Sequence, residues 1–558
     1  MRRQIGGVKL SREKIFVAIC LVAAFTIRLL LLPGEAGVIN GDGAYYATLG
    51  ARLASGDIYG GISGYWSPLY SAFVGVSSFF FRDVEFAGRF VSVVAGTFVL
   101  IPSYLLIREF YGLKQAWLGA ALLTVHPFLI QSSTWVMTEA LYTLLFVTVV
   151  LVGWRALHDF RSKWLFVTGV LWGLAYLTKP ESIGFLGLLL LLAAFAKVLQ
   201  PRVTVFRWLI GCLLVLSGFA VLFVPYVVFV HQKTGRWTIS QKVMVNVPAA
   251  DYDKGFLSIT DDDLTMQDRI WGDNYDSDGS RPENVSAPDE ASASFSLSGF
   301  GSDLMILGSK TVSSFKTQIK TYVPTVLPFP FILFAIVGFF AKPWSRVRAV
   351  RELYLFAFVI SMFLGYAASA AELRYVFPLI PIFVAFATNG IVEFSRWASR
   401  SIQKLLNTER PVGHAWIYIL TTLCLSFLFV PLFLSIRESS DADLPREEKR
   451  AGKWLDTQMG PGPRIVMAPN ITVAFYAKAK HLFLPAEDLP TVLSYADRKG
   501  VNYIVFSERR LRFNTFAFPD VDPSLLSRMK LVYKDDEIPN CRLRIYELEN
   551  QPRSGIER

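Results

Sequence analysis

Four ionisable residues stand beside apolar stretches of the chain, where a charged side chain needs a functional or a structural reason. Asp42 lies in INGDGAYYA, Glu139 in TWVMTEALYT, Lys179 in LTKPES and Arg374 in AAELRYVFPLIP. A carboxylate can take a proton from an attacking hydroxyl, and fixed Lys and Arg side chains can neutralise a departing phosphate without a metal. Together these residue types predict chemistry on an anionic lipid head group.

Each of the four also has a simpler interpretation. Lys179 and Arg374 can snorkel to the membrane interface at little cost, and Asp42 can cap a helix that starts at AYYATLGARLA. Glu139 snorkels poorly because its carboxylate is on a short stem, which favours a functional role. Arg28, deeper in an apolar stretch, is more typical of a structural residue.

The elements that must position these residues are membrane spans. Of the 558 residues, 53% are hydrophobic and only 18% charged, with a mean hydropathy of +0.40, whereas soluble domains have about 25% charged residues. The apolar residues gather in blocks close to the length that crosses about 30 Å of hydrocarbon. We expect eleven spans, at about 15–32, 86–107, 115–132, 138–154, 164–178, 183–199, 208–230, 327–341, 352–370, 376–394 and 415–436.

The first block is expected to be a retained span, because Arg28 interrupts it and no small-residue cleavage pattern follows. The net charge of +11 is attributed to membrane orientation and not to a nucleic-acid partner. The four cysteines indicate neither a metal site nor a disulfide framework: Cys20, Cys212 and Cys424 lie in apolar blocks and Cys541 stands alone.

Orientation follows from the short loops. With a cytoplasmic N-terminus, the loops that return to that side are rich in Lys and Arg, near 108–114, 155–163, 197–207, 342–351 and 396–410. The opposite short loops hold at most one basic residue each, so the chain obeys the positive-inside rule. Although other loops fixed this orientation, all four candidate residues fall on the outer face, and the C-terminus also lies outside.

Two long outer loops are predicted, at 33–85 and 231–326. The first contains aromatic side chains typical of interfacial helices: Tyr45, Tyr46, Tyr65, Trp66 and Tyr70. All of these except Tyr65 are expected to line a lipid or substrate groove together with Tyr375. The second is acidic between Asp251 and Glu290 and ends in an amphipathic segment near 300–322. The run Asp261–Asp263 is interpreted as solvated loop and not as a metal site. The domains are thus expected to be 1–438, which spans the membrane, and 439–558 outside.

The polar C-terminal region alternates between helical and strand patterns. REEKRAGKWLDTQM and DLPTVLSYADRKG are predicted helices, and RIVMA, HLFL, VNYIVF, LVYK and RLRIYEL are predicted strands. This alternation is typical of a small α/β domain with a largely parallel sheet. No Gly-rich phosphate loop occurs in it.

Several motifs, taken in order, resemble the GT-C glycosyltransferases, and within them the protein O-mannosyltransferase-like group that includes the lipid A aminoarabinose transferases. They are GDGAYYATLGARLASG followed by YWSPLY, then TEALYT, LTKPES and LRYVFPLIP, and the resemblance covers about residues 15–395. Two departures stand out: Gly43 follows Asp42 where many relatives have Asp-Glu, and YWSP replaces the Lys-Pro-Pro of the aminoarabinose transferases. Donor and acceptor identity therefore cannot be copied from that subgroup.

The resemblance implies roles for the candidate residues. Asp42 would be the catalytic carboxylate, and Glu139 a second acidic residue that orients acceptor or sugar or helps to bind a cation. Lys179 and Arg374 would contact the phosphate of a polyprenyl-phosphate sugar, and inversion at the anomeric carbon is expected. A divalent cation between Asp42 and Glu139 stays open, because related enzymes differ in metal need.

The expected function is therefore transfer of a sugar from a polyprenyl-phosphate donor to an acceptor hydroxyl on the outer face of the plasma (inner) membrane. The acceptor class stays open between a lipid, a glycan and a protein. Two alternatives remain: a lipid-glycan polymerase or ligase, which would use the same donor on the same side, and a transporter or flippase, which places its charges near the midplane.

Overall fold

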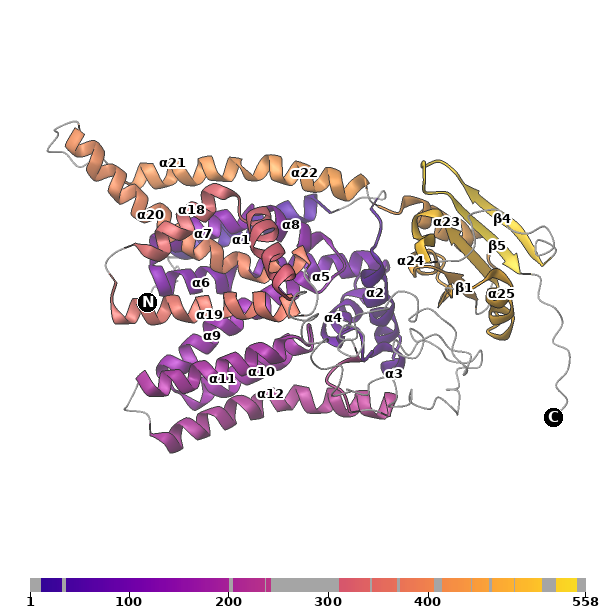
Figure 1. The fold of residues 1–558 in the computed structure, drawn as a ribbon, viewed down its shortest axis with the longest axis horizontal. Helices are drawn as coiled ribbons and strands as arrows, with labels where there is room; N and C mark the ends of the chain where they lie inside the picture. The colour runs from indigo at the N-terminus through magenta and orange to yellow at the C-terminus, as the bar shows by residue number, and fades with distance from the viewer. Residues whose placement is uncertain are drawn as a thin grey trace, which may run out of the picture. The chain divides into compact units, whose positions relative to one another are not determined.

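The computed structural model describes residues 12–32, 37–199, 204–235, 237–241, 311–341, 344–368, 372–405, 414–442, 444–460, 464–485, 487–513 and 528–548 (Figure 1). The acidic region 251–290, including Asp261–Asp263, lies outside these residues, and the amphipathic segment is described only from residue 311. The chain divides into two compact units. The first, the helical bundle, comprises Met1–Leu32, Phe86–Tyr226 and Ser296–Ser440. The second, the polar unit, comprises Pro33–Glu85, Val227–Phe295 and Asp441–Arg558.

Every predicted apolar block coincides with helix. The long helices are α1 (Arg12–Leu30), α5 (Val84–Phe98), α6 (Leu100–Tyr111), α7 (Leu113–Thr124), α8 (Pro127–Thr134), α9 (Glu139–Asp159), α10 (Ser162–Tyr176), α11 (Ser182–Leu199), α12 (Val205–Thr234), α18 (Phe329–Phe340), α19 (Arg346–Ala368), α20 (Ile380–Leu405), α21 (His414–Phe427) and α22 (Phe429–Ala442).

Among the described residues, five helices are long and apolar enough to cross a membrane, and seven if two bent pairs each count as one span. One bent pair is α7 with α8, at 50°, and the other joins Thr311–Val326 to α18, at 104°. The polytopic helical fold is confirmed, while the number of eleven spans stays a prediction. Helix α1 is not among the five; it carries charged residues at both ends, including Arg28.

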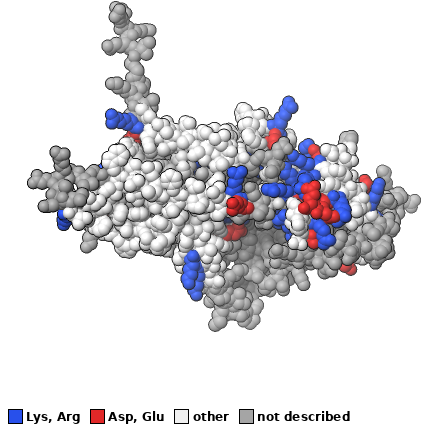
Figure 2. Space-filling view, turned by 90° about the horizontal axis from the view of Figure 1, so that it is seen from above, with Lys and Arg blue, Asp and Glu red and all other residues white. Residues whose placement is uncertain are grey.

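The bundle has an interior and a lipid-facing exterior. In the most apolar window of α9, 83% of the residues are buried, and in the window of Leu373–Leu405 all of them are, against 17% for Trp416–Glu438. Many large apolar side chains of the outer helices are exposed, and Figure 2 shows a broad surface without Lys, Arg, Asp or Glu on the face in view. The interior helices are therefore the ones able to hold a buried polar site.

Helix α20 packs closely against α18 where a glycine of each helix faces the other helix's backbone. A Cβ added at Gly338 would collide with the carbonyl oxygen of Phe386, and one added at Gly390 would collide with that of Phe334. The backbones of α18 and α20 therefore touch directly, as small residues allow in membrane helices. Asn389 donates a hydrogen bond of 2.8 Å to the carbonyl of Gly338 across this contact.

Arg28 supports the break between α7 and α8. Its side chain is fully buried and donates to the carbonyl of Thr124, at 3.3 Å, and to the hydroxyl of Ser133, at 3.1 Å. Pro127 follows the break and cannot continue the ladder of α7. Arg28 therefore has a structural role: it donates to the carbonyl of Thr124, which the break leaves without a partner in the α7 ladder.

In the polar unit, the first outer loop forms α2 (Gly41–Ala54), α3 (Ile58–Gly61) and α4 (Pro68–Ser78). Tyr45, Tyr46, Trp66 and Tyr70 of this loop are buried, and Tyr65 is half-buried. The rings of Tyr45 and Trp66 stack with centroids 3.9 Å apart, and those of Tyr46 and Tyr70 meet edge to face at 5.4 Å. Their place in a lipid or substrate groove stays a prediction.

The C-terminal residues form a five-stranded sheet in the order β2-β1-β3-β5-β4. The strands are β1 (Ile465–Ala468), β2 (Lys480–Phe483), β3 (Tyr503–Ser507), β4 (Met529–Asp535) and β5 (Leu543–Leu548). The helices are α23 (Arg446–Gln458), α24 (Thr472–Tyr476) and α25 (Leu489–Arg498). The predicted α/β alternation is present.

The sheet is mixed and not largely parallel. The register is parallel where Val466 of β1 pairs with His481 and with Tyr503, and antiparallel where β5 pairs with β3 and β4. The chain between β4 and β5 contains no helix that could carry it back for a parallel crossover, so these strands pair as a hairpin.

Candidate active site

Three of the four predicted residues meet inside the helical bundle. Glu139 is the first residue of α9, Lys179 follows α10, and Arg374 lies in the 3-10 helix η3 (Leu373–Leu379), just before α20. Asp42 belongs to the polar unit, in the first turn of α2. The bundle therefore brings together the candidate phosphate ligands and the second carboxylate.

An ion pair joins α9 to the turn after α10. Lys179 donates a hydrogen bond of 3.1 Å from Nζ to Oε1 of Glu139, and Nε of Arg374 lies 3.9 Å from the same oxygen. The side chains of Glu139 and Lys179 are 2% and 9% exposed, and that of Arg374 is 22% exposed. A carboxylate at the first position of a helix is also favoured by the helix dipole. Snorkelling does not describe Lys179, whose ammonium group is buried against a carboxylate.

Local sequence explains these positions. The amide of Lys179 bonds to the carbonyl of Ala175, Pro180 follows, and the Ser182 hydroxyl donates to the carbonyl of Lys179 at 2.8 Å. The turn is thus fixed on both sides of the lysine. In η3, Pro378 lacks a backbone donor and limits the helical ladder before α20 begins.

Aromatic rings and a second carboxylate complete the surroundings of the two cations. The ammonium of Lys179 lies 4.9 Å from the ring centroid of Tyr375, whose ring stacks on Tyr366 at 4.3 Å. Glu372 accepts from the Arg374 guanidinium, with its Oε2 2.5 Å from Nε. Tyr375 was predicted as a groove residue, whereas Glu372 and Tyr366 were not. Glu372 lies two residues before Arg374 in the same motif, and this proximity could have identified it as a site residue.

Four buried oxygen atoms in this neighbourhood have no hydrogen-bond partner among the described residues: Oε2 of Glu139, Oε2 of Glu181 and the hydroxyls of Tyr142 and Tyr366. Tyr366 is within electrostatic range of both carboxylates. Buried polar atoms are normally paired. Their gathering around Lys179 and Arg374 is what a site for a polar ligand requires.

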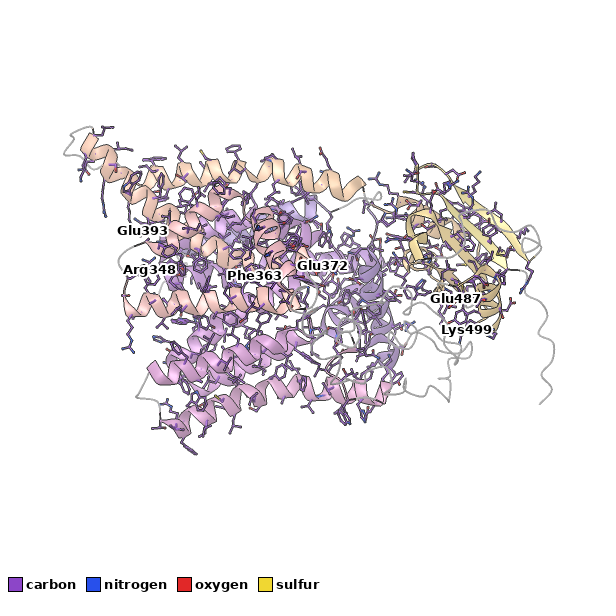
Figure 3. The ribbon with its side chains drawn as sticks, in the orientation of Figure 1. Arg348, Phe363, Glu372, Glu393, Glu487 and Lys499 are labelled. Carbon is purple, nitrogen blue, oxygen red and sulfur yellow. The ribbon has the colours of Figure 1, made fainter. Side chains whose placement is uncertain are left out.

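The site lies at one defined end of the bundle. At the other end, basic residues from the predicted cytoplasmic loops hold helix ends together: Arg108 pairs with Glu13 at 2.7 Å and Arg155 with Glu109 at 2.8 Å. Along α9, Glu139 and Arg155 are separated by about 24 Å, at 1.5 Å per residue. Figure 3 likewise shows Glu372 towards one end of the bundle and Arg348 and Glu393 towards the other.

Asp42 is half-exposed near the N-terminus of α2. Asn40, and not Asp42, caps this helix: its side chain accepts from the amide of Gly43 at 2.6 Å. The capping interpretation of Asp42 is therefore not needed, and its carboxylate stays a candidate for chemistry.

The donor set around Glu139 does not fit a metal ion. Its carboxylate already has two cationic side chains within 4 Å, and a divalent cation would be repelled by both. Within the part of the chain that the structure describes, no group of three or more His, Cys, Asp or Glu side chains is arranged to hold a metal.

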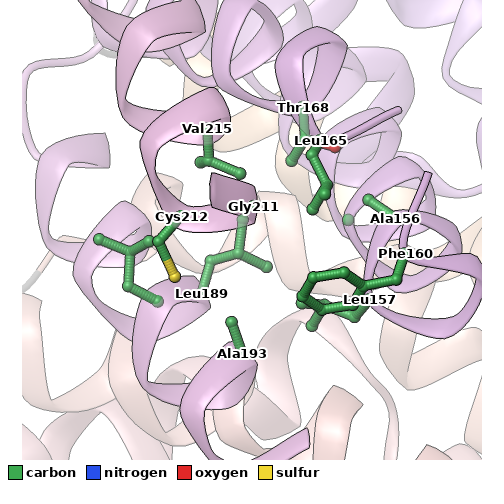
Figure 4. Close-up of a pocket in the computed structure, with 12 residues that line it drawn as sticks. Ala156, Leu157, Phe160, Leu165, Thr168, Leu189, Ala193, Gly211, Cys212 and Val215 are labelled. Atoms are coloured by element: carbon green, nitrogen blue, oxygen red, sulfur yellow. The ribbon is translucent and has the colours of Figure 1, made fainter. Parts of the chain in front are cut away.

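The bundle also contains a small apolar cavity, which is separate from the cluster of Glu139, Lys179 and Arg374. It is enclosed by α9, α10, α11 and α12 and lined by side chains such as Leu157, Phe160, Leu189 and Val215 (Figure 4). The hydroxyl of Thr168, at its wall, is already bonded to the carbonyl of Trp164. The cavity lacks groups that recognise a sugar or a phosphate.

The fold is shared with solved membrane glycosyltransferases. ArnT from Cupriavidus metallidurans, in a structure bound to undecaprenyl phosphate, matches with a TM-score of 0.58 and 13% identity over 96% of this chain and 97% of that chain. The archaeal oligosaccharyltransferase AglB from Archaeoglobus fulgidus, in complex with an inhibitory peptide and a dolichol-phosphate, matches with a TM-score of 0.54 and 12% identity over 89% of this chain and 69% of that one. The chain thus has the fold of the GT-C glycosyltransferases.

Residues 66–228 also match the model of the family described as dolichyl-phosphate-mannose-protein mannosyltransferase. This segment includes Glu139 and Lys179. The resemblance predicted from the motifs is therefore confirmed. No curated protein sequence matches the chain.

Proposed function

We propose that the protein is an integral membrane glycosyltransferase that moves a sugar from a polyprenyl-phosphate donor to an acceptor hydroxyl on the outer face of the membrane. The observation that carries this proposal is the buried cluster of Glu139, Lys179 and Arg374 at the end of a GT-C bundle opposite its basic loops. The matched ArnT structure is bound to undecaprenyl phosphate, and the matched AglB structure to a dolichol-phosphate. A polyprenyl phosphate is the matching ligand class for two clustered cations.

In the proposed reaction, the Asp42 carboxylate takes the proton of the acceptor hydroxyl. The acceptor oxygen forms a bond to the anomeric carbon as the bond from that carbon to the phosphate oxygen breaks. The polyprenyl phosphate leaves with the electron pair and gains one negative charge. Lys179 and Arg374 stabilise that charge, so their interaction strengthens as the transition state is reached.

The proposed role of Glu139 is to hold the two cations in place before donor binds. Without a carboxylate, two buried cationic groups would repel each other and their desolvation would be uncompensated. Arg can clasp a phosphate bidentately, whereas Lys acts as a point charge. A donor phosphate would therefore share both cations with Glu139, without needing a metal.

The sidedness follows from the loop charges. With a cytoplasmic N-terminus, the Glu139–Lys179–Arg374 cluster and the C-terminal residues would lie on the outer face of the plasma membrane. The acceptor there would be a lipid, a glycan or a protein. Charges gathered at one end, and not at the midplane, favour transfer over transport.

The test is reconstitution of the purified chain in nanodiscs with a panel of radiolabelled polyprenyl-phosphate sugars and extracted envelope lipids, glycans and proteins. Movement of label to an acceptor, with release of one polyprenyl phosphate per sugar, would support the proposal. Growth of a repeating glycan on the lipid carrier would assign a polymerase or ligase. Label that crosses a liposome membrane without transfer would assign a transporter.

The role of Asp42 is tested by Asp42→Asn, a nearly isosteric change that removes the base. Turnover should fall about 10²–10⁴-fold, with unchanged thermal unfolding because the α2 cap is Asn40. Asp57→Asn is the matched control, since that carboxylate caps α3 in the same outer loop. Near-normal turnover of the Asp42 variant would remove it as the base.

A further inference from the structure

The C-terminal residues grip the short segment that carries Asp42. Three of their side chains bond to it from three different elements. Lys449 of α23 donates to the carbonyl of Gly37 at 2.5 Å, and the Tyr476 hydroxyl of α24 accepts from the amide of Ile39 at 3.0 Å. His481 of β2 bonds through Nδ1 to the Tyr45 hydroxyl at 3.1 Å. Residues 37–45, with Asp42 between these contacts, are thus fixed at both ends.

A fourth contact reaches the residue next to Asp42. A Cβ added at Gly41 would lie 2.9 Å from Oδ1 of Asn470, which follows β1. The Asn470 amide therefore packs directly on the first residue of α2. A larger residue at position 41 would displace the Asn470 side chain from this contact.

Two of the side chains that hold this segment, Tyr476 and His481, make further hydrogen bonds that fix their own positions. The Tyr476 hydroxyl also donates to Oε2 of Glu85 at 2.9 Å, so that one side chain ties together the two ends of the first outer loop. His481 donates from Nε2 to the carbonyl of Ala468 at 3.1 Å, which leaves Nδ1 to accept from Tyr45. Tyr45 in turn stacks on Trp66. These bonds link the N-terminal end of α2 and the segment before it to α23, α24 and β2.

We propose that residues 441–558 act as a clamp that aims Asp42, with Asn470 as the positioning residue at the start of α2. The inference rests on the proposed role of Asp42 as base and gives the C-terminal residues a part in catalysis that does not require them to contact substrate. A base works only when held within hydrogen-bond reach of the proton it removes. Small misplacements cost large factors in rate.

The main test uses two substitutions at Asn470 in the full-length protein. Asn470→Ala should lower kcat about tenfold and leave the KM for donor within about twofold, because the phosphate ligands lie in the bundle. Asn470→Asp places a carboxylate against Gly41, the residue before Asp42, and a neighbouring like charge raises the pKa of a carboxyl group. The acidic limb of its pH–kcat profile should move to higher pH by about half a unit or more.

Two matched variants separate positioning from general damage. Gln458→Glu adds a negative charge to an exposed site in the same domain, and Asp456→Asn removes a surface ion pair with Lys478. Both should keep the parental pH profile and kcat. Tyr476→Phe, which deletes the hydroxyl shared by Ile39 and Glu85, should speed amide hydrogen exchange in residues 37–47 at least tenfold.

The outcomes are distinct from those for the proposed function. If the parent transfers no sugar, the function proposal fails, but the exchange measurement still tests the clamp. If the parent is active and Asn470→Ala matches it in kcat, or Asn470→Asp keeps the parental acidic limb, Asn470 does not position the base. Unchanged exchange in Tyr476→Phe would refute the clamp itself.

Discussion

Neutralising Glu139 and Lys179 separately and together would show whether their pair stabilises the bundle, serves the phosphate, or does both. The two side chains are 2% and 9% exposed and bonded at 3.1 Å. Removing one partner of a buried pair costs about 3–5 kcal/mol, because the other charge stays buried, whereas removing both can be nearly neutral. The three variants are Glu139→Gln, Lys179→Met and the double substitution.

The neighbours reduce each single cost. In Glu139→Gln, the ammonium keeps two aromatic ring faces, at 4.9 Å to Tyr375 and 5.6 Å to Tyr142, and cation–π contacts are worth up to about 2 kcal/mol. In Lys179→Met, the carboxylate keeps Arg374 at 3.9 Å. We therefore expect each single variant to lose about 2–3 kcal/mol and the double variant to lie within about 1 kcal/mol of the parent.

Unfolding free energies in mixed micelles and donor turnover in nanodiscs would be measured on all four proteins. The double variant should regain stability yet stay at least about tenfold slower, since one phosphate cation is gone. Additive single losses, with a coupling below about 0.5 kcal/mol, would show that the ion pair carries no energy. Parental turnover in the double variant would refute the phosphate role of Lys179.

Three further predictions test the donor grip, the orientation and the C-terminal contacts. Arg374→Lys keeps the charge but loses bidentate bonding, so donor affinity or kcat should fall about ten- to a hundredfold; separately measured KM and kcat that equal the parent's would favour snorkelling. Reporter fusions after residues 405 and 440 should report opposite sides of the membrane, and finding both on one side would overturn the sidedness. Burial lowers the pKa of His481 from 6.5 to about 4, so the unfolded chain takes up the proton first and stability is lost as pH falls from about 6.5 towards 4. His481→Gln should flatten that loss in pH-dependent thermal unfolding, and an unaltered acid slope would contradict the assignment.

The helical architecture was predictable because a membrane-spanning helix requires a long uninterrupted run of apolar residues, which is visible in the sequence. The breaks were less visible. The block at 115–132 reads as one span, yet it bends between α7 and α8, where Pro127 and the buried Arg28 act together. A residue almost a hundred positions away stabilises that bend, and no local pattern records it.

Part of the site was predictable for a similar reason. Loop charges alone put Glu139, Lys179 and Arg374 on one face, and the bundle brings them together. The sequence did not indicate that Glu139 pairs with Lys179, because partner choice depends on how α9 and α10 pack. Tyr366 was missed as well, since a tyrosine within an apolar helix has no pattern that separates a site residue from a packing residue.

In the C-terminal sheet, the alternation of helix and strand patterns predicts strand direction for only part of the chain. Helices between β1, β2 and β3 predict parallel neighbours, and these strands are parallel. Beyond β3 the sequence alternates less clearly, and the strand pattern alone does not separate a hairpin from a crossover. The antiparallel β4–β5 pair was therefore not predicted.

The buried Arg28 has a consequence for how the protein is made. An arginine at the centre of a helix costs about 2.5–3.5 kcal/mol during insertion by the translocon. Arg28 lies in the last turn of α1, where this cost is smaller but still weakens α1 as an insertion signal. The groups that satisfy its guanidinium, the Thr124 carbonyl and the Ser133 hydroxyl, are synthesised about a hundred residues later. Stable residence of the first helix in the bilayer should therefore wait for the third apolar block, and nascent chains that stop before residue 124 should hold α1 only at the translocon or its chaperones.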